Sequence, residues 1–340
     1  MAVRCALLLA FMLFVSRQAA MADEALSPQL LRWLEPQAWQ RDTTGPIISL
    51  GESGQFDDQH LLSPTVAWEN GEFLLWYIGA RGAVNDRVFR LGLARSRDGK
   101  TFERHAGNPV LQFNDLRHSV LTPVLLRNTD GTPLREDGKL RLWFSSTDFQ
   151  DPTGRHTLHE STSSDGVQWS TPSASLLDHC YSPTIVKQGD EYLLWYTDVS
   201  AASWCFRHAR SRDGRSWTVD EQPVMEVEQS WEAKRLFYPA VIQTDGGFVM
   251  WYGSYWRGET AKTALGCAVS QDGRTWVRSP HNPVFRPDPD RSWESHYTTS
   301  QSVIRLSDGS WRIWYATRTK PPHRNKYFAI STARWSGPGE

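Results

Sequence analysis

The sequence has few features typical of membrane, nucleic-acid-binding or zinc proteins. Beyond the N-terminal leader, no segment is apolar over the roughly 20 residues that a transmembrane helix needs, so we expect no membrane anchor. No lysine- or arginine-rich run indicates a nucleic-acid-binding surface, so we expect no nucleic-acid partner. Cysteine is scarce, at four residues, and its spacing fits no zinc motif.

The first 22 residues have the layout of a secretory signal peptide. Arg4 provides a positive charge, residues 6–15 are apolar, and residues 20–22 form a small-x-small cleavage site. We therefore expect cleavage after Ala22 and a secreted or periplasmic protein. The remaining chain, 23–340, has 35 basic and 38 acidic residues, a net charge of −3, and is long enough for one large all-β domain.

Three cysteines remain after the leader: Cys180, Cys205 and Cys267. An oxidising export compartment permits disulfides. Cys180 and Cys205 belong to the same repeat, which makes a bond between them one interpretation. The alternative is that all three are small buried residues with free thiols.

A fivefold repeat is the strongest signal in the sequence. A run that starts near a proline precedes a polar, glycine-containing turn and then a strand that ends in tryptophan and a second aromatic residue. The proline-type starts are 63–66, 122–125, 182–185, 238–241 and 300–303, the last without the proline. The aromatic pairs are Trp76-Tyr77, Trp143-Phe144, Trp195-Tyr196, Trp251-Tyr252 and Trp314-Tyr315.

Each unit continues with two more predicted strands, separated in four units by a Ser-x-Asp-Gly turn. The turns begin at Ser96, Ser163, Ser211 and Ser270, and we expect their aspartates to be structural because an Asp side chain bonds its own turn. Five units of four strands predict an all-β, five-bladed β-propeller that occupies residues 23–340 as a single domain.

The fifth unit lacks its last strand. Trp39 lies seven residues before Pro46, as Trp276 lies seven before Pro283, so we expect the segment around 38–41 to supply the missing strand. The ring then closes with both ends of the chain, which removes a free sheet edge. The tryptophan–aromatic pairs are expected to pack between blades.

The loops that lead into the innermost strands and those that follow the second strands should share one face of the propeller. The first set carries acids and histidines, and Asp57, Glu232 and Glu294 share one offset, for which the alternative is a repeated structural carboxylate. We predict five catalytic candidates: Asp57, Asp58, Asp115, Asp178 and Glu232. The predicted substrate-binding residues are His60, Arg81, His118, Asp148, Asp198, Trp204, Arg235, Tyr255, Glu294, His296 and Arg318.

These residue types suit sugar chemistry. Glycoside cleavage needs one acid to protonate the leaving oxygen and a second carboxylate to activate water or attack the sugar. Within the set, Asp58 or its neighbour Asp57 is the predicted base or nucleophile. Asp178 or Glu232 is the predicted acid. Asp115 is predicted to tune the pKa of that acid or to orient it. The predicted partner is an oligo- or polysaccharide.

The five units and their Ser-x-Asp-Gly-x-x-aromatic turns resemble the five-bladed propeller glycoside hydrolases, the group around families 43, 32, 62, 68 and 117. The resemblance covers nearly the whole chain after the leader. It implies an acid, a base or nucleophile, and a third aspartate around a central funnel. Family 43 places an aspartate directly before the first-blade proline, where this sequence has Ser63, so no catalytic residue transfers.

Two other functions fit the pattern. One is a non-catalytic carbohydrate-binding propeller. The other is an enzyme with a divalent metal in the funnel, because His60, His118, His179 and His296 lie in four of the loops that lead into innermost strands. Apart from such a metal, we predict no cofactor.

Overall fold

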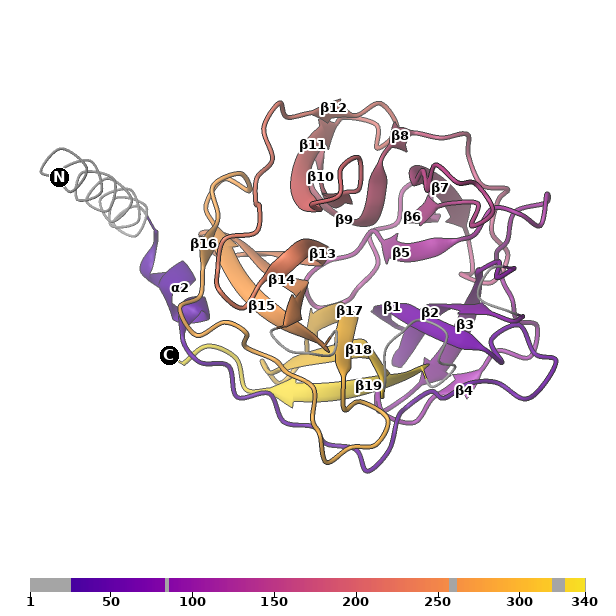
Figure 1. The fold of residues 1–340 in the computed structure, drawn as a ribbon, viewed down its shortest axis with the longest axis horizontal. Coiled ribbons are helices and arrows are strands. Elements are labelled where there is room, and N and C mark those ends of the chain that lie inside the picture. The colour runs from indigo at the N-terminus through magenta and orange to yellow at the C-terminus, as the bar shows by residue number, and fades with distance from the viewer. Residues whose placement is uncertain (1–25, 83–85, 257–261, 320–327, 340) are drawn as a thin grey trace, which may run out of the picture.

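The protein is an all-β propeller of five blades arranged around one axis (Figure 1). The computed structural model describes residues 26–82, 86–256, 262–319 and 328–339. The predicted signal peptide lies outside these residues. Among them no helix is long and apolar enough to cross a membrane.

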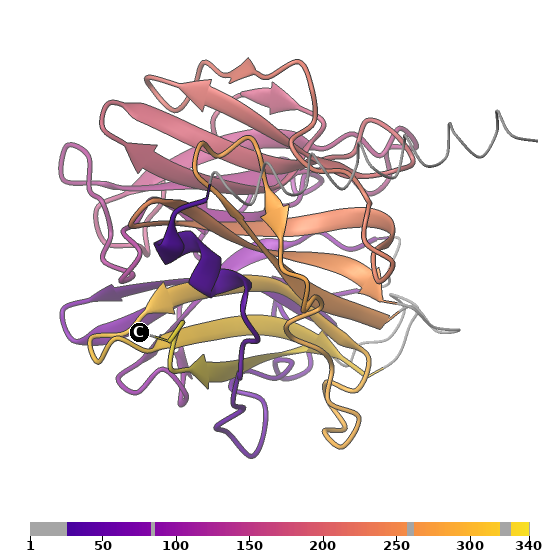
Figure 2. The same cartoon turned by 90° about the vertical axis from the view of Figure 1, so that its left-hand side faces the viewer.

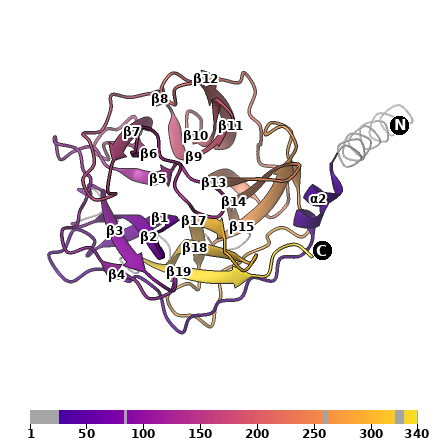
Figure 3. The same ribbon diagram turned by 180° about the vertical axis from the view of Figure 1, so that it is seen from behind.

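Each blade is a small antiparallel sheet whose first strand lies nearest the axis, and these first strands contact one another around the ring (Figures 1 and 3). Blade 1 contains β1 (His60–Glu69), β2 (Glu72–Ala80), β3 (Arg90–Ser96) and β4 (Glu103–Arg104). Blade 2 contains β5 (Leu121–Leu125), β6 (Leu140–Ser146), β7 (Thr157–Ser163) and β8 (Leu177–Asp178). Blade 3 contains β9 (Cys180–Gln188), β10 (Glu191–Asp198), β11 (Cys205–Ser211) and β12 (Thr218–Val219). Blade 4 contains β13 (Ala233–Thr244), β14 (Gly247–Trp256), β15 (Lys262–Ser270) and β16 (Val277–Arg278). Blade 5 contains β17 (Tyr297–Arg305), β18 (Trp311–Arg318) and β19 (Phe328–Trp335).

The repeated tryptophans join neighbouring blades, as the sequence predicts. All five are fully buried, and each indole N–H finds an acceptor outside its own blade. Four of them donate to the glycine carbonyl of the Asp-Gly turn in the next blade: Trp76 to Gly166 (2.9 Å), Trp143 to Gly214 (2.9 Å), Trp195 to Gly273 (2.6 Å) and Trp314 to Gly99 (2.9 Å). Because a buried indole N–H needs a partner, these bonds help fix how adjacent blades pack.

The Asp-Gly turns are structural, which confirms that prediction. In the first, the Asp98 carboxylate accepts hydrogen bonds from the backbone N–H groups of Lys100 and Thr101 and from the Ser96 hydroxyl. Gly99 then takes a φ of 70°, which glycine adopts without steric cost. The same turn presents the glycine carbonyl to the tryptophan of the previous blade.

The N-terminal segment completes the fifth blade. Gln40 exchanges two backbone hydrogen bonds with Arg334 of β19, which confirms the predicted fourth strand around 38–41. The described part of the fifth blade has no Ser-x-Asp-Gly turn after its third strand. Gln37 takes the place of that turn, since its side-chain oxygen accepts the indole N–H of Trp251 at 2.9 Å. The segment begins with α2 (Pro28–Leu31) and the 3₁₀ turn η1 (Arg32–Leu34), which lie beside blade 4 (Figure 2).

A bulge recurs where each innermost strand reaches its proline position. The five residues at this point have left-handed backbones with φ between 43° and 55°: Ser63, Thr122, Ser182, Tyr238 and Ser300. In every blade the pairing register between the first and second strands shifts here. A bulge bends a strand and re-aims its side chains, and its repetition in five blades points to a role in shaping the axis.

The three cysteines of the described chain are free, so the interpretation of a Cys180–Cys205 disulfide is wrong. Asp198 of the central strand β10 pairs with Cys180 on one side and with Cys205 on the other. The two cysteines are therefore two strand spacings apart, about 9–10 Å, and a disulfide requires Cα atoms within about 7 Å.

Candidate functional site

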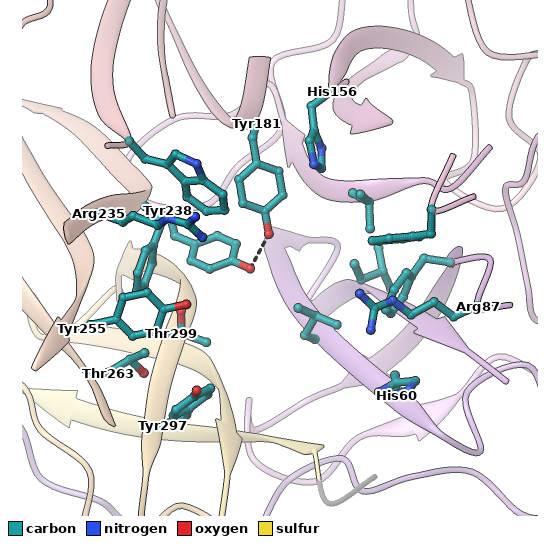
Figure 4. Close-up of a pocket in the computed structure, with 17 residues that line it drawn as sticks. His60, Arg87, His156, Tyr181, Arg235, Tyr238, Tyr255, Thr263, Tyr297 and Thr299 are labelled. Carbon is teal, nitrogen blue, oxygen red and sulfur yellow. Dashed lines mark hydrogen bonds between the residues drawn. The ribbon is translucent and has the colours of Figure 1, made fainter. Parts of the chain in front are cut away.

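A pocket of about 220 Å³ lies at the end of the axis where the innermost strands begin (Figure 4). All five innermost strands contribute to its wall: His60 of β1, Leu121 of β5, Tyr181 of β9, Tyr238 of β13 and Tyr297 of β17. The loops of blades 1 to 3 add further side chains: Arg87, Phe89, Phe149, His156 and Trp204. The pocket thus lies where the sequence places the funnel.

Two tyrosines form a hydrogen-bonded pair inside the pocket. The hydroxyl oxygens of Tyr181 and Tyr238 are 2.5 Å apart (Figure 4). Burial raises the pKa of Tyr181 to about 12 and that of Tyr238 well above its usual value. Both hydroxyls therefore stay protonated at neutral pH.

Two arginines from different blades line the pocket. The Arg87 guanidinium lies over the Phe149 ring at 4.3 Å, and the Arg235 guanidinium lies over the Trp204 ring at 4.2 Å. A backbone bridge between Trp204 and Arg235 fixes the second pair. No aspartate or glutamate is found among the described residues that line this pocket. The lining is therefore aromatic and cationic.

Two histidines, His60 and His156, also line the pocket. Burial lowers the pKa of His156 to about 4, so its ring is neutral at pH 7. His156 packs against the Tyr181 ring, with ring centroids 4.8 Å apart, while His60 packs near Phe89. A neutral imidazole offers one donor and one acceptor, which suits a sugar hydroxyl.

Three predicted site residues, Asp57, Glu232 and Glu294, belong to a repeated structural contact outside this pocket. Each is 6% exposed or less and accepts a hydrogen bond from the tyrosine of its own blade's aromatic pair. Each also pairs with an arginine on the outermost strand. The sets are Asp57 with Tyr77 and Arg104, Glu232 with Tyr252 and Arg278, and Glu294 with Tyr315 and Arg41.

The packing around these carboxylates supports the structural interpretation. A methyl group on Gly92 would come within 2.4 Å of the Phe56 ring, and one on Gly266 would come within 2.6 Å of the Trp231 ring. The aromatic residue before Asp57 and Glu232 therefore fits against a glycine of the third strand. In the fifth blade, Trp293 before Glu294 instead donates its indole N–H to the Ser331 hydroxyl of β19 at 3.0 Å. The shared offset of these acids in the sequence reflects this packing.

The other predicted catalytic acids lie in polar contacts near loop ends. Asp58 accepts a hydrogen bond from the backbone N–H of Gly54 at 2.8 Å, and its second oxygen is buried without a partner in the described chain. Asp115 contacts the His118 ring at 2.6 Å, and Asp178 forms an ion pair with Arg155 at 2.6 Å. The described lining of the pocket includes none of the three.

The remaining predicted binding residues divide between the pocket and its surroundings. His60, Trp204, Arg235 and Tyr255 line the pocket. Arg318 is not part of the described lining, but its guanidinium lies 3.8 Å from the ring centroid of Tyr297, which lines the pocket. The others contact protein groups elsewhere: Arg81 the Gly54 carbonyl, Asp148 Arg117, Asp198 Arg207, and His296 the Ser295 hydroxyl.

The described residues contain no group of three or more histidine, cysteine, aspartate or glutamate side chains placed to hold a metal ion. Of the four histidines in the metal hypothesis, only His60 belongs to the described lining of the pocket, and the His118 ring contacts Asp115. The metal alternative therefore has no ligand set in the described part of the chain.

Sequence reasoning missed Arg87, His156, Tyr181, Tyr238 and Tyr297 as pocket residues. One signal was present in the repeat itself, because Tyr238 occupies the position before the proline where the other blades have serine or threonine. The left-handed backbone at that position turns its side chain toward the axis. Arg87 and His156 lie in loops of irregular length, which carry no repeat register.

Comparison with solved structures identifies the class of fold. The chain superposes on a protein from Parabacteroides distasonis that is described as a candidate glycoside hydrolase, with a TM-score of 0.68 and 15% identity, covering 91% of this chain and 99% of that one. An α-L-arabinofuranosidase from Podospora anserina, in complex with cellotriose, gives a TM-score of 0.64 at 11% identity, covering 90% and 99%. The fold is therefore that of the five-bladed propellers found among glycoside hydrolases.

A third structure comes from the GH130 family of mannoside phosphorylases. That family contains glycoside hydrolases that target β-1,2 mannosidic linkages in Candida mannan. This structure gives a TM-score of 0.66 at 16% identity, covering 88% of this chain and 94% of that one. In sequence, the chain is 25% identical over 240 residues to uncharacterised proteins from two strains of Mycobacterium tuberculosis, covering 67% of this chain and 77% of each relative. No protein-family model matches the chain.

Proposed function

We propose that the protein is a glycan-acting enzyme, of the glycoside hydrolase type, that binds an oligo- or polysaccharide in the axial pocket. The observation that carries the proposal is the pocket lining. Aromatic rings at Trp204, Tyr255 and Tyr297 offer stacking surfaces, and hydroxyl, imidazole and guanidinium groups alternate with them. Sugars are recognised by this combination of apolar ring faces and a few placed polar groups.

For the cleavage step we retain three of the predicted acids as candidates. Asp58, Asp115 and Asp178 lie on loops or strand ends, and one oxygen of Asp58 makes no hydrogen bond to the described residues, so that carboxylate is not fully occupied. Asp57 and Glu232 are less suited, because a tyrosine and an arginine already occupy each carboxylate. A hydrolase of this kind needs two such groups on either side of the bond.

A non-catalytic carbohydrate-binding propeller is the second candidate. It is favoured by one observation, the lack of any aspartate or glutamate among the described residues that line the pocket. Such a protein would retain a glycan without releasing sugar. We also propose export of the protein, with residues 1–22 as the leader, which N-terminal sequencing of the exported protein tests.

The test of function is sugar release by the purified protein, from Asp23 onward, against a broad panel of polysaccharides and aryl glycosides. Trp204→Ala perturbs the pocket, and the double variant Asp58→Asn/Asp178→Asn removes two candidate acids. We expect the protein to release sugar, and we expect each variant to lower the rate of release at least about tenfold. Lost substrate positioning or lost proton transfer lowers a rate by that factor or more. Glycan retention without release favours the binding module. A protein that shows no binding and no release would refute the proposal.

A further inference from the structure

The charge of the pocket distinguishes it from the rest of the molecule. Where a carboxylate is buried in the blades, an arginine accompanies it, as in the contacts of Arg104 with Asp57 and Arg278 with Glu232. In the pocket two arginines, Arg87 and Arg235, are present without an ion pair to any described carboxylate. A cleft lined by charge of one sign attracts ligands of the other sign.

Arg87 is the more informative of the two. Its guanidinium lies 4.3 Å from the Phe149 ring centroid and 5.8 Å from the Phe89 ring centroid, so these two rings help set its position. Its Nε atom is buried and has no hydrogen-bond partner among the described residues. Burial lowers the pKa of Arg87, which means that its charge is only partly solvated. A half-buried charge without a counterion is stabilised by an anion that binds against it.

The tyrosine pair lies within the electrostatic range of Arg87. The Arg87 charge acts to lower the pKa of both Tyr181 and Tyr238 against the larger effect of burial. In the hydrogen bond between the two hydroxyls, one proton is shared and the other remains free to donate. Arg87 and this remaining hydroxyl together offer several N–H and O–H donors to one acceptor group.

We infer that the carbohydrate ligand is acidic, and that its carboxylate, sulfate or phosphate group binds between Arg87 and the Tyr181–Tyr238 hydroxyl pair. This inference rests on the proposed function and narrows it to a class of sugar. The planar guanidinium fork matches the two oxygens of a carboxylate, sulfate or phosphate group. Arg235, stacked on Trp204 across the pocket, then contacts the neighbouring part of the glycan (Figure 4).

The same donors also suit a free inorganic anion, so the experiment separates the two sources. Isothermal titration of the full chain from Asp23 onward uses matched pairs of ligands that differ only in the charged group. One set pairs uronic-acid oligosaccharides with their carboxyl-reduced forms. The other pairs sulfated or phosphorylated oligosaccharides with their desulfated or dephosphorylated forms. Inorganic phosphate and inorganic sulfate are titrated alone.

We expect at least one acidic member to bind at least about tenfold more tightly than its neutral partner, the difference that a charge-assisted hydrogen bond contributes. Arg87→Gln should remove most of that difference, so that the acidic and neutral members of a pair bind with nearly equal affinity. Arg87→Lys should restore only part of it, because an ammonium group lacks the fork geometry. Arg32→Gln, which changes an exposed arginine of the N-terminal turn, is the matched control.

Three results would overturn the inference. Equal affinity for acidic and neutral partners would show a neutral-sugar site and leave the proposed function intact. Binding of inorganic phosphate or sulfate without binding of any acidic glycan would identify a free-anion site. An unchanged preference in Arg87→Gln would show that the anion binds elsewhere, and failure of every glycan to bind would refute the proposed function itself.

Discussion

Removal of the Trp33 side chain tests how much the N-terminal segment contributes to closing the ring. Trp33 is 5% exposed, and its ring packs edge-on against three other tryptophans, Trp251, Trp311 and Trp335, at centroid distances of 5.7, 4.9 and 5.8 Å. These partners come from blades 4 and 5, so one side chain joins the segment to both. Trp33→Ala should leave a cavity at the seam between the first and last parts of the chain.

The expected cost is about 3–5 kcal/mol of unfolding free energy, which is typical of a buried tryptophan cut back to alanine. For a domain of about 318 residues that corresponds to a fall in melting temperature of roughly 4–8 °C. Urea unfolding followed by tryptophan fluorescence and by circular dichroism measures the free energy. Leu31→Ala is the matched control on the same segment, because Leu31 is 36% exposed and should cost less than about 0.5 kcal/mol.

A loss below about 1 kcal/mol in Trp33→Ala, similar to the control, would refute the argument that this segment completes the fold. A chain that begins after Asp42 extends the test. It lacks Gln37 and Gln40, so the Trp251 indole N–H loses its acceptor and the end of β19 at Arg334 becomes an unpaired edge, while Ile330 keeps its backbone bonds to Ile47 and Ile48. Such a chain should aggregate, since an exposed strand edge pairs with other chains.

Three further outcomes are expected. Asp57→Asn should lower the free energy of unfolding by about 1–3 kcal/mol, because Tyr77 and Arg104 lose a buried carboxylate acceptor. Glycan binding per folded molecule should stay unchanged. Lost turnover at unchanged stability would instead support a catalytic role for Asp57. The folded-state pKa of His156, about 4, lies below the ordinary value of about 6.5, so the unfolded chain binds the extra proton first. Stability should therefore fall as the pH drops from about 6.5 toward 4. His156→Asn should flatten that part of the stability profile, and an equally steep profile in the variant would contradict this assignment. Cys180 and Cys205 are free, so thiol titration of the denatured protein should count both without reductant, and dithiothreitol should not shift the melting temperature; a titration that needs reductant would mean that they are bonded.

The repeat allowed the fold to be predicted because each of its elements has a local physical cause. The Ser-x-Asp-Gly turns form from their own side chains, and the buried tryptophans occur at matching positions in every unit. The missing strand of the last blade was also predictable, since Trp39 keeps the spacing of Trp276 to its proline. These signals are local or repeated, and one sequence contains five copies of them.

The candidate site was predicted only in part. The face of the propeller and four pocket residues, His60, Trp204, Arg235 and Tyr255, followed from loop position. Asp57 and Glu232 share the register of a repeat, and a repeated acid is consistent with a folding role as well as with chemistry. Their tyrosine and arginine partners lie 20 to 47 residues away, so the sequence order does not reveal them.

The sequence by itself determined the number of blades, the order of strands and the way in which the two ends of the chain meet. These follow from alternation, turn chemistry and a repeat, all of which operate over a few residues. Only the tertiary structure decided which side chains face the axis. Arg87 and His156 come from the loops after the second strands of blades 1 and 2, Tyr181 from the start of β9, and Tyr238 from the bulge in β13. They meet because the ring brings its innermost strands together at one end.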